Sequence, residues 1–444
     1  MTSNKRWSRL TMTRPSSWVV VAALCCSTAW ANPPVDAVRY TIKPGDTINN
    51  LAQRLLTPPP NIAEVQQANQ IRNLDRIGVG QVLLLPRSAL RFTPSHATVM
   101  QVNCTSNIVV SNKAVEVGDK LNEGDVVEIP GACSMGLALE DGSVVRVPAG
   151  GRLQINMLRT NVLEAAPVIR MQISRGRVEV SVNKGVGRTA PFEISTPTVV
   201  MGVRGTEFRV GHSDEGDNSL VEVLSGQVGV GAPGATPDAE KRVPGGRGVV
   251  VDAQGGTLAD EALLPGPTLE VTDTTQLHWR LKVDATADAE KVWVRQSQLA
   301  TLADMPTPTP LKDLEYWIHK PEVTAMFYEL VGESAAGLRG EVSRYGVCAS
   351  ATNMCNVVFN SPFAPSMPIR IRLERVEGGQ PLTVVLSRNL RTADGLFVLT
   401  GLPAGRYRWV ITQATSSGQA STADNRLQET GEFVLINGPG PRQP

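Results

Sequence analysis

The sequence has few of the residues on which most enzymes rely. Its 444 residues include four histidines, which are far apart in the sequence: His96, His212, His278 and His319. No His-x-His, His-Glu-x-x-His or Gly-x-Ser-x-Gly arrangement occurs, so the signatures of metallohydrolases and serine hydrolases are missing. We therefore expect no enzyme activity, no catalytic residues, no metal site and no cofactor.

An excess of charge of one sign is lacking as well. Lys and Arg together number 43 against 42 Asp and Glu, which gives a net charge of +1. A protein that binds nucleic acid through its phosphates carries a basic patch or a strongly basic composition. Nucleic acid is therefore not an expected partner.

Long apolar runs are absent, and the one short run that stands out lies near the N-terminus. Four basic residues precede the apolar run 18–26, and small residues follow within 29–31. This order is typical of a cleaved signal peptide, because the run is too short to span a membrane comfortably. We expect residues 1–31 to be removed on export, leaving no transmembrane segment. Lipidation at Cys25 or Cys26 is the alternative, although neither is preceded by a small residue.

Four cysteines follow this leader, namely Cys104, Cys133, Cys348 and Cys355. An even number of cysteines in an exported chain indicates disulfides, and three pairings are possible. Proximity along the chain favours Cys104 with Cys133 and Cys348 with Cys355. Four unpaired thiols are the alternative, whereas a zinc site is disfavoured because no histidine lies near either pair.

The length and the turn residues predict a multidomain, mainly β protein. A chain of 444 residues is too long for one hydrophobic core and should divide into three or four domains. With 40 Gly and 31 Pro and few long helical patterns, most of these domains should consist of short strands joined by turns.

Residues 38–87 predict a small α+β module with the order βααβ. A short alternating strand at 39–42 is followed by a turn and by a helix at 49–56, which a run of prolines ends. Asn61 can cap a second helix that extends to about Asn69, and residues 81–86 supply the closing strand.

This module resembles the LysM family over essentially its whole length. The matching residues are Tyr40-x-Ile42-x-Pro44-Gly45-Asp46-Thr47-Ile48, Leu51-Ala52, Asn69 and Gly80-Gln81-x-Leu83-x-x-Pro86. The resemblance implies binding of a glycan that contains N-acetylglucosamine, such as peptidoglycan, between two loops. The implied contacts are Gly45, Asp46, Thr47 and Ile48 in one loop and Ile71, Arg72 and Asn73 in the other. Turn and cap chemistry also explains the first of these loops, and the two interpretations are compatible.

Residues 98–260 predict an all-β roll or solenoid-like sandwich, because short valine-rich strands alternate with glycine turns. Several segments are similar to the FecR-like periplasmic domain, above all Gly202-Val203-Arg204-Gly205-Thr206-Glu207-Phe208. The resemblance implies an interaction module, with Arg204 and Glu207 as a possible partner surface. The alternative is that this motif is a Gly-Thr turn that enters a buried strand.

In FecR-type sensor regulators this domain passes a signal across a membrane. Such a regulator needs a cytoplasmic segment and a transmembrane helix, whereas here the apolar run begins at Trp18 and looks cleavable. We therefore interpret the domain as an exported scaffold. A sensor that docks on an envelope membrane protein is the alternative.

The C-terminal region predicts two immunoglobulin-like or fibronectin-like β-sandwich units, at 266–362 and 363–438. Residues 402–407 resemble the turn into a late strand of fibronectin-like repeats. Four tryptophans in this region could form a sugar platform, but tryptophans in sandwiches more often fill the core: Trp279, Trp293, Trp317 and Trp409.

Together these features predict an exported, periplasmic and cell-wall-associated protein that binds peptidoglycan without catalysis. A muramidase that relies on carboxylates alone would need a substantial cleft-bearing domain, and no segment predicts one.

Overall fold

The computed structural model describes residues 36–438 with internal gaps. The gaps are 75, 105–106, 132, 165, 185–190, 204, 214–215, 235–239, 276, 302–307, 361–368, 378–379, 391–394 and 414–427. The predicted signal peptide and its two cysteines lie outside the described residues. Within the described part of the chain, no helix has the length and apolar character needed to cross a membrane.

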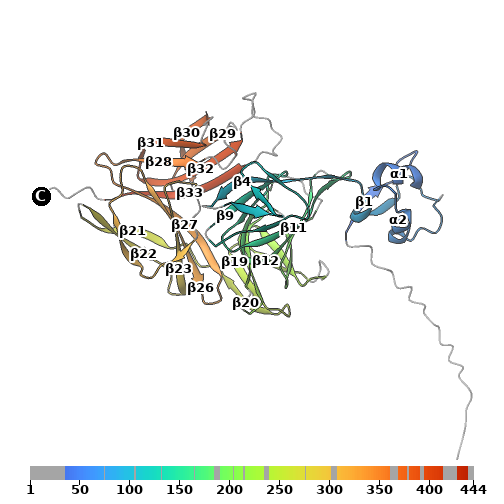
Figure 1. Ribbon diagram of the computed structural model, residues 1–444, viewed down its shortest axis with the longest axis horizontal. Coiled ribbons are helices and arrows are strands. Elements are labelled where there is room, and N and C mark those ends of the chain that lie inside the picture. The colour runs from blue at the N-terminus through green and yellow to red at the C-terminus, as the bar shows by residue number, and fades with distance from the viewer. Residues whose placement is uncertain are drawn as a thin grey trace, which may run out of the picture.

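The molecule is multidomain and mainly β, as the composition predicts. Figure 1 shows a small module with both helices at one end, a two-sheet domain beside it, and further β-sheets at the other end. These three parts follow one another along the long axis in the order of the sequence (Figure 1).

The N-terminal module has the predicted βααβ order. It consists of β1 (Ala37–Thr41), α1 (Ile48–Leu55), α2 (Ile62–Asn69) and β2 (Val82–Pro86). The two strands pair antiparallel, and the buried face of α1 packs over them. Thr47 caps α1 by accepting a hydrogen bond from the Asn50 backbone N–H, and the Asn50 side chain accepts one from the Thr47 N–H in return. This reciprocal capping box fixes where the first helix begins.

The middle domain consists of two sheets that share one long strand, β12 (Val168–Ser181). The first sheet holds β3 (Phe92–Pro94), β5 (Ile108–Val110), β6 (Lys113–Val115), β8 (Val126–Glu128), β11 (Arg152–Asn161), β13 (Phe192–Ser195), β14 (Val200–Val203), β17 (Gln227–Gly231) and β18 (Lys241–Pro244). The second holds β4 (Ala97–Asn103), β7 (Lys120–Leu121), β9 (Ser134–Leu139), β10 (Val144–Val147), β15 (Glu207–Ser213), β16 (Asn218–Ser225), β19 (Arg247–Val251) and β20 (Thr257–Ala262).

Successive hairpins alternate between these two sheets, which is the solenoid-like arrangement that the glycine turns predict. The N-terminal half of β12 pairs in the first sheet and its C-terminal half in the second. The change occurs at Gly176, which has a φ of +77°, and a Cβ there would lie 2.8 Å from the Cα of Gly151. A glycine is therefore required where the strand passes from one sheet to the other.

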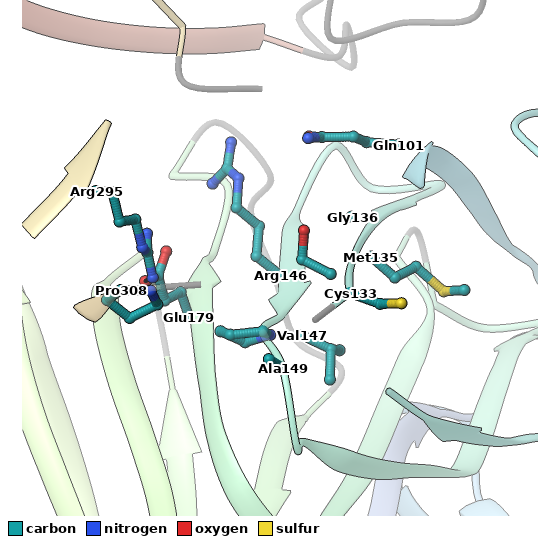
Figure 2. A pocket seen from close by; sticks show the side chains of 12 residues that line it. Gln101, Cys133, Met135, Gly136, Arg146, Val147, Ala149, Glu179, Arg295 and Pro308 are labelled. Carbon is teal, nitrogen blue, oxygen red and sulfur yellow. Dashed lines mark hydrogen bonds and ion pairs between the residues drawn. The ribbon is translucent and has the colours of Figure 1, made fainter. Parts of the chain in front are cut away.

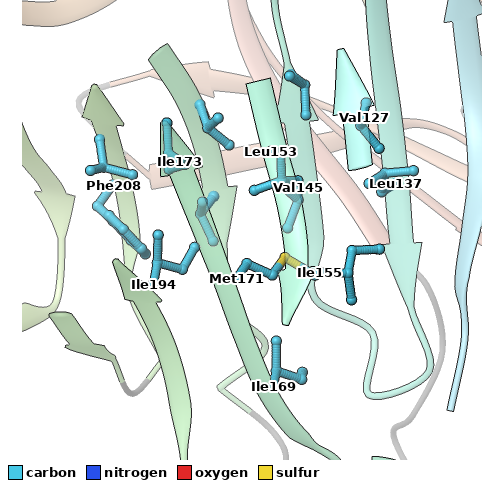
Figure 3. Packing of buried hydrophobic residues seen from close by; sticks show 14 of the residues in the cluster. Val127, Leu137, Val145, Leu153, Ile155, Ile169, Met171, Ile173, Ile194 and Phe208 are labelled. Atoms are coloured by element: carbon cyan, nitrogen blue, oxygen red, sulfur yellow. The ribbon is translucent and has the colours of Figure 1, made fainter. Parts of the chain in front are cut away.

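The inward-facing residues of the two sheets form one continuous apolar core. Figure 3 shows valine, leucine, isoleucine and methionine side chains from several strands interleaving between the sheets. Alternate residues of β11 and β12 are fully buried, for example Leu153, Ile155, Met171 and Ile173. The apolar residues at every second position of these strands thus face one shared core.

The first C-terminal unit is a two-sheet sandwich. One sheet contains β21 (Thr268–Thr274), β22 (His278–Asp284) and β25 (Glu315–His319). The other contains β23 (Ala289–Ser297), β24 (Thr309–Pro310), β26 (Met326–Ser334) and β27 (Arg339–Cys348). Two facing sheets of three and four strands agree with a fibronectin-like or immunoglobulin-like sandwich.

The second unit shares a sheet with the first. Its strands are β28 (Met354–Asn360), β29 (Ile369–Glu377), β30 (Gln380–Leu390), β31 (Leu396–Pro403), β32 (Gly405–Gln413) and β33 (Gln428–Asn437). β33 runs parallel to β27, which makes the larger sheets of both units continuous. β28 pairs with β31 of the second unit. The sequence had predicted that residues 354–360, which form β28, belong to the first unit.

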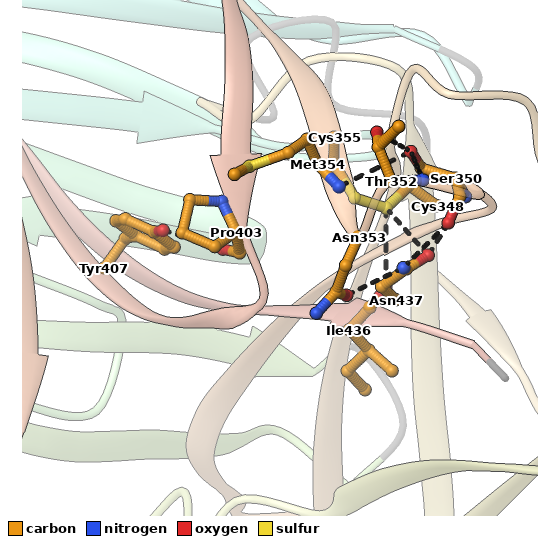
Figure 4. Close-up of a disulfide and its surroundings, with 10 residues drawn as sticks. All are labelled: Cys348, Ser350, Thr352, Asn353, Met354, Cys355, Pro403, Tyr407, Ile436 and Asn437. Carbon is orange, nitrogen blue, oxygen red and sulfur yellow. Dashed lines mark hydrogen bonds between the residues drawn. A yellow bond between two sulfur atoms is a disulfide. The ribbon is translucent and has the colours of Figure 1, made fainter.

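Both predicted disulfides, Cys104–Cys133 and Cys348–Cys355, are present. Figure 4 shows the second one at the junction of the two sandwich units, beside Asn437. Nearby, the Tyr407 hydroxyl donates to the carbonyl of Pro403 at 2.7 Å. This contact is a tyrosine corner, so the resemblance of residues 402–407 to a fibronectin-like turn is confirmed.

A hairpin of the first sandwich packs against the middle domain. The Arg209 guanidinium donates to the carbonyls of Arg339 at 2.7 Å and Gly340 at 2.5 Å. Glu222, which is 1% exposed, forms ion pairs with Arg177 and Arg209 and accepts the Arg339 backbone N–H at 2.8 Å. The contact between these domains is therefore buried and both ionic and backbone-mediated.

Candidate functional site

The two loops of the N-terminal module lie at the same end of its two-stranded sheet. Thr41 at the end of β1 pairs with Val82 at the start of β2. Beyond this pair, the Gly80 N–H donates to the Ile42 carbonyl and the Ile42 N–H donates to the Gln81 carbonyl, both at 2.9 Å. The loop that enters α1 and the loop that leaves α2 are thus brought together, as the predicted site requires.

Asp46 organises the first loop. Its carboxylate accepts the Tyr40 hydroxyl and the Lys43 backbone N–H, each at 2.8 Å, and the Arg54 guanidinium lies 3.2 Å away. Gly45 precedes it with a φ of +87°, a conformation that favours glycine. The side chain of Asp46 is therefore engaged within the loop and holds its shape.

These contacts change the titration of two groups. The Lys43 backbone hydrogen bond, with those of Tyr40 and Arg54, holds the pKa of Asp46 below its ordinary value. Desolvation and the hydrogen bond to Asp46 raise the pKa of the Tyr40 phenol. Both effects keep the carboxylate ionised and the phenol protonated, so the loop keeps the same hydrogen bonds at neutral pH.

The remaining predicted contact residues do not all face solvent. Thr47 is exposed but is committed to capping α1, whereas Ile48 is 5% exposed and belongs to the core of the module. Ile48 therefore contributes little apolar surface to a ligand. In the second loop, Ile71 is half-buried, and Arg72 and Asn73 are exposed.

Two residues of the module matter in ways that the motif alone did not indicate. The Asn50 side chain donates to the Gly45 carbonyl at 2.9 Å and so connects the helix to the loop. The Asn69 side chain donates to the Leu84 carbonyl at 2.7 Å and accepts the Leu84 N–H at 2.6 Å. Asn69 completes the hydrogen bonding of β2 and is structural. The position of Asn50 three residues after Thr47 was the available signal for its capping role.

A small set of ion pairs attaches the module to the middle domain. The Arg87 guanidinium lies 2.9 Å from both Asp36 and Glu164, and Arg170 lies 2.7 Å from Asp36. Burial raises the pKa of Asp36, but hydrogen bonds from Arg170 and Arg87 and their positive charges outweigh it and hold this pKa below its ordinary value. These contacts involve neither predicted glycan loop.

The predicted partner surface of the middle domain is only partly described. Arg204 lies outside the described residues. Glu207 is exposed at the start of β15 and lines a hollow of about 1400 Å³ between the middle domain and the sandwich units. Thr206 is fully buried, and its hydroxyl donates to the Gln227 carbonyl at 3.0 Å. The motif therefore forms a turn that enters a buried strand, with its glutamate beside an interdomain hollow.

A smaller hollow lies next to Cys133. Figure 2 shows Glu179 and Arg295 on one side of it and Cys133 and Met135 on the other. Burial raises the pKa of Glu179, but the charge of Arg295, supported by other arginines, lowers it to about 2. A carboxylate held ionised in this way is poorly suited to act as a general acid at neutral pH.

The four tryptophans of the sandwich region do not form one surface. Trp279 and Trp409 are each 1% exposed and belong to two different cores. The Trp293 indole N–H donates to Glu333 at 2.8 Å, and Trp317 is 50% exposed. Among the described residues, no group of three or more His, Cys, Asp or Glu is arranged to hold a metal ion.

Comparison with known families identifies two of the domains. The LysM domain model matches residues 40–86, and the FecR protein model matches residues 125–229. The chain therefore contains a LysM domain followed by a FecR domain. Both domain types are typical of extracytoplasmic proteins, and the two disulfides are compatible with export.

Comparison of the sequence with curated proteins gave no match. Among solved structures, a Parabacteroides distasonis protein described as an anti-sigma factor is 21% identical, with a TM-score of 0.25, and the match covers 31% of this chain. This chain spans 59% of the length of that structure. A segment of two fibronectin type III domains from chicken tenascin is 13% identical, with a TM-score of 0.14, covering 38% of this chain and 99% of the segment. Likenesses of this size carry no functional argument.

Proposed function

We propose that this is a non-catalytic, periplasmic peptidoglycan-binding protein. The LysM domain would hold N-acetylglucosamine-containing glycan, and the FecR domain and sandwich units would form the body that it anchors. The observation that carries the proposal is the LysM match over residues 40–86, with both implied glycan loops at one end of the module.

The chemistry of the two loops supports this class of ligand. The first loop is held in shape by Asp46 and by Asn50, so it presents a fixed backbone geometry. In the second loop, Arg72 and Asn73 are exposed polar side chains beside the apolar Ile71. Fixed backbone groups, polar side chains and a small apolar surface are suited to hydroxyl and acetamido groups of a sugar.

Sedimentation of the mature chain with insoluble peptidoglycan tests the proposal. We expect Arg72→Glu to weaken retention by about tenfold. Arg72 can donate hydrogen bonds to the glycan at the implied contact, whereas a glutamate at this position offers only acceptor oxygens. Arg76→Glu is the matched control, since Arg76 is an exposed arginine of the same loop outside the implied contacts. Equal retention of both variants and the unchanged protein would overturn the assignment of the loop.

The absence of catalysis is part of the proposal and has its own test. Incubation of the mature chain in a gel that contains peptidoglycan should leave the gel opaque. A zone of clearing at the mass of the chain would show hydrolysis and contradict a purely binding role.

The FecR match favours a second candidate, an envelope sensor that docks on a membrane protein. Crosslinking in cells from exposed positions of the FecR domain, such as Val109 and Val117, distinguishes the two. One defined membrane protein captured reproducibly from both positions supports the sensor. Capture of peptidoglycan-associated material alone supports the anchored scaffold.

A further inference from the structure

Two of the four histidines, isolated from each other in the sequence, face each other in the fold. His278 in β22 lies directly opposite His319 in β25 in an antiparallel pair, and their ring centroids are 4.8 Å apart. The Lys320 N–H donates to the Leu277 carbonyl at 2.8 Å, so the neighbouring pair is hydrogen-bonded. The histidines therefore occupy a non-hydrogen-bonded position, where opposing side chains come closest.

Both rings lie on the outer face of the sandwich. Trp279, the next residue along β22, is 1% exposed and points into the core, so His278 points the opposite way. His278 is half-buried and His319 is exposed. Core packing thus does not account for the pair, and a solute in the surrounding water can reach it.

The spacing of the rings fits two imidazoles on one transition metal ion. With a metal–nitrogen bond of about 2.0–2.1 Å, the metal lies about 3.2 Å from each ring centroid. For bond angles between square and tetrahedral, the two centroids are then about 4.5–5.2 Å apart. The observed 4.8 Å falls within this interval.

The other two histidines have partners of their own. His96 Nδ1 is 2.8 Å from Asn122 Oδ1. His212 is 6% exposed, and its Nε2 lies 3.1 Å from an Asp217 carboxylate oxygen. The chain therefore offers two histidines with local polar partners as controls for the facing pair.

We propose that His278 and His319 form a surface binding site for a divalent transition metal ion of the Zn²⁺, Ni²⁺ or Cu²⁺ class, each imidazole supplying one nitrogen. The remaining coordination positions are open to water or to an exchangeable ligand. Binding connects β22 to β25 by a second means besides their hydrogen bonds. Imidazole nitrogens suit these ions, whereas Mg²⁺ and Ca²⁺ require oxygen ligands.

Calorimetric titration of the untagged mature chain with each ion tests the site. We expect one ion per chain, tighter binding of Cu²⁺ than of Ni²⁺ or Zn²⁺, and no binding of Mg²⁺ at the same concentration. Thermal unfolding in the presence of Cu²⁺ should shift to higher temperature, because the ion binds the folded strand pair. Equal heats from Mg²⁺ and Cu²⁺ would overturn the proposal.

Three variants locate the ion. His278→Asn and His319→Asn should each weaken Cu²⁺ binding by about tenfold or more, because loss of a ligand costs at least as much as loss of a group that orients one. His96→Asn should leave it unchanged. In the spectrum of bound Cu²⁺, each of the first two substitutions should reduce the nitrogen coupling from that of two imidazoles to that of one. Unchanged Cu²⁺ affinity in either variant, or an equal loss of affinity in His96→Asn, contradicts the assignment, provided that unfolding without metal shows each variant to be folded.

Discussion

The LysM domain and the first sandwich unit are both attached to the FecR domain, but by contacts of different kinds. The LysM contact depends on Arg87, whose partners are Asp36, which is 38% exposed, and Glu164, which is 1% exposed. The sandwich contact uses buried arginines, a glutamate that is 1% exposed and backbone carbonyls of an inserted hairpin. Apolar packing adds to the second contact, since Leu338 at the hairpin is 1% exposed and lies against Gly248.

This difference assigns separate roles to the two ends of the molecule. Separating the FecR domain from the sandwich units would break the hydrogen bonds of Arg209 and Glu222 to the hairpin backbone and would expose Leu338. The LysM domain is attached through the ion pairs of Arg87 and Arg170. Those with Asp36 are partly exposed and therefore individually weak, whereas the pair of Arg87 with Glu164 is buried. We therefore expect the proposed glycan-binding end to separate from the FecR domain more readily than the sandwich units do.

Glu222→Gln, at the sandwich contact, should cause the largest loss in the free energy of unfolding. It leaves the Arg177 and Arg209 guanidinium groups without their shared carboxylate in a buried place, which costs about 3–5 kcal/mol. Denaturant unfolding of the mature chain measures this loss. Glu432→Gln is the control, because Glu432 pairs with Arg408 at the surface and its loss should cost at most about 1 kcal/mol. Similar losses in both variants would show that the junction is not specially buried.

Leu338→Ala should come next, since it removes a buried leucine that joins two domains. We expect a loss of about 2–4 kcal/mol in the free energy of unfolding. The same unfolding experiment measures it. Leu277→Ala, at a leucine that is 71% exposed, should change stability by no more than about 0.5 kcal/mol.

Arg87→Ala should have a smaller effect, confined to the LysM attachment. Glu164 would lose its arginine, although the Asn161 side chain still donates to it at 2.6 Å. We expect about 1–2 kcal/mol of weakened docking and faster proteolysis of residues 87–97, with unchanged retention on peptidoglycan. Arg39→Ala, at an exposed position of β1, serves as control. Lost glycan retention in the Arg87 variant would contradict the separation of attachment and binding.

Lowering the pH towards 5 should have the smallest effect on the two contacts, because both contain carboxylates with lowered pKa values. Glu179 at the junction has a pKa of about 2 against its ordinary 4.5, so its stabilisation is complete above about pH 4.5 and disappears as the pH falls towards 2. The pKa of Asp36 is also lowered, so the LysM contact is complete above about pH 4 and weakens below that. Hydrogen exchange between pH 7 and pH 5 should show no loosening of either contact; loosening in that range would contradict the assigned shifts.

Much of this architecture could be predicted from the sequence because its signals are local. Valine alternation, the glycine turns and the turn and cap residues before the first helix each act over a few residues, and the strands, turns and helix that they predict are present. Both favoured cysteine pairings are present as well. The pairing of residues 354–360 with the second unit depends on strands far apart in the chain, which local pattern does not encode.

The candidate site shows the same limit. The LysM motif predicted which loops meet, but it did not separate Ile48, which is buried in the core, from residues that a ligand can touch. The facing of His278 and His319 follows from the register of two strands separated by two others in sequence. Such register is fixed by the shared core and not by any motif.

The most direct test of the account is hydrogen exchange of the full mature chain with and without soluble peptidoglycan fragments. We predict slower exchange in residues 43–48 and 70–81 and unchanged exchange throughout the FecR domain and the sandwich units. Protection confined to the FecR domain or the sandwich units, with none in the two LysM loops, would contradict it.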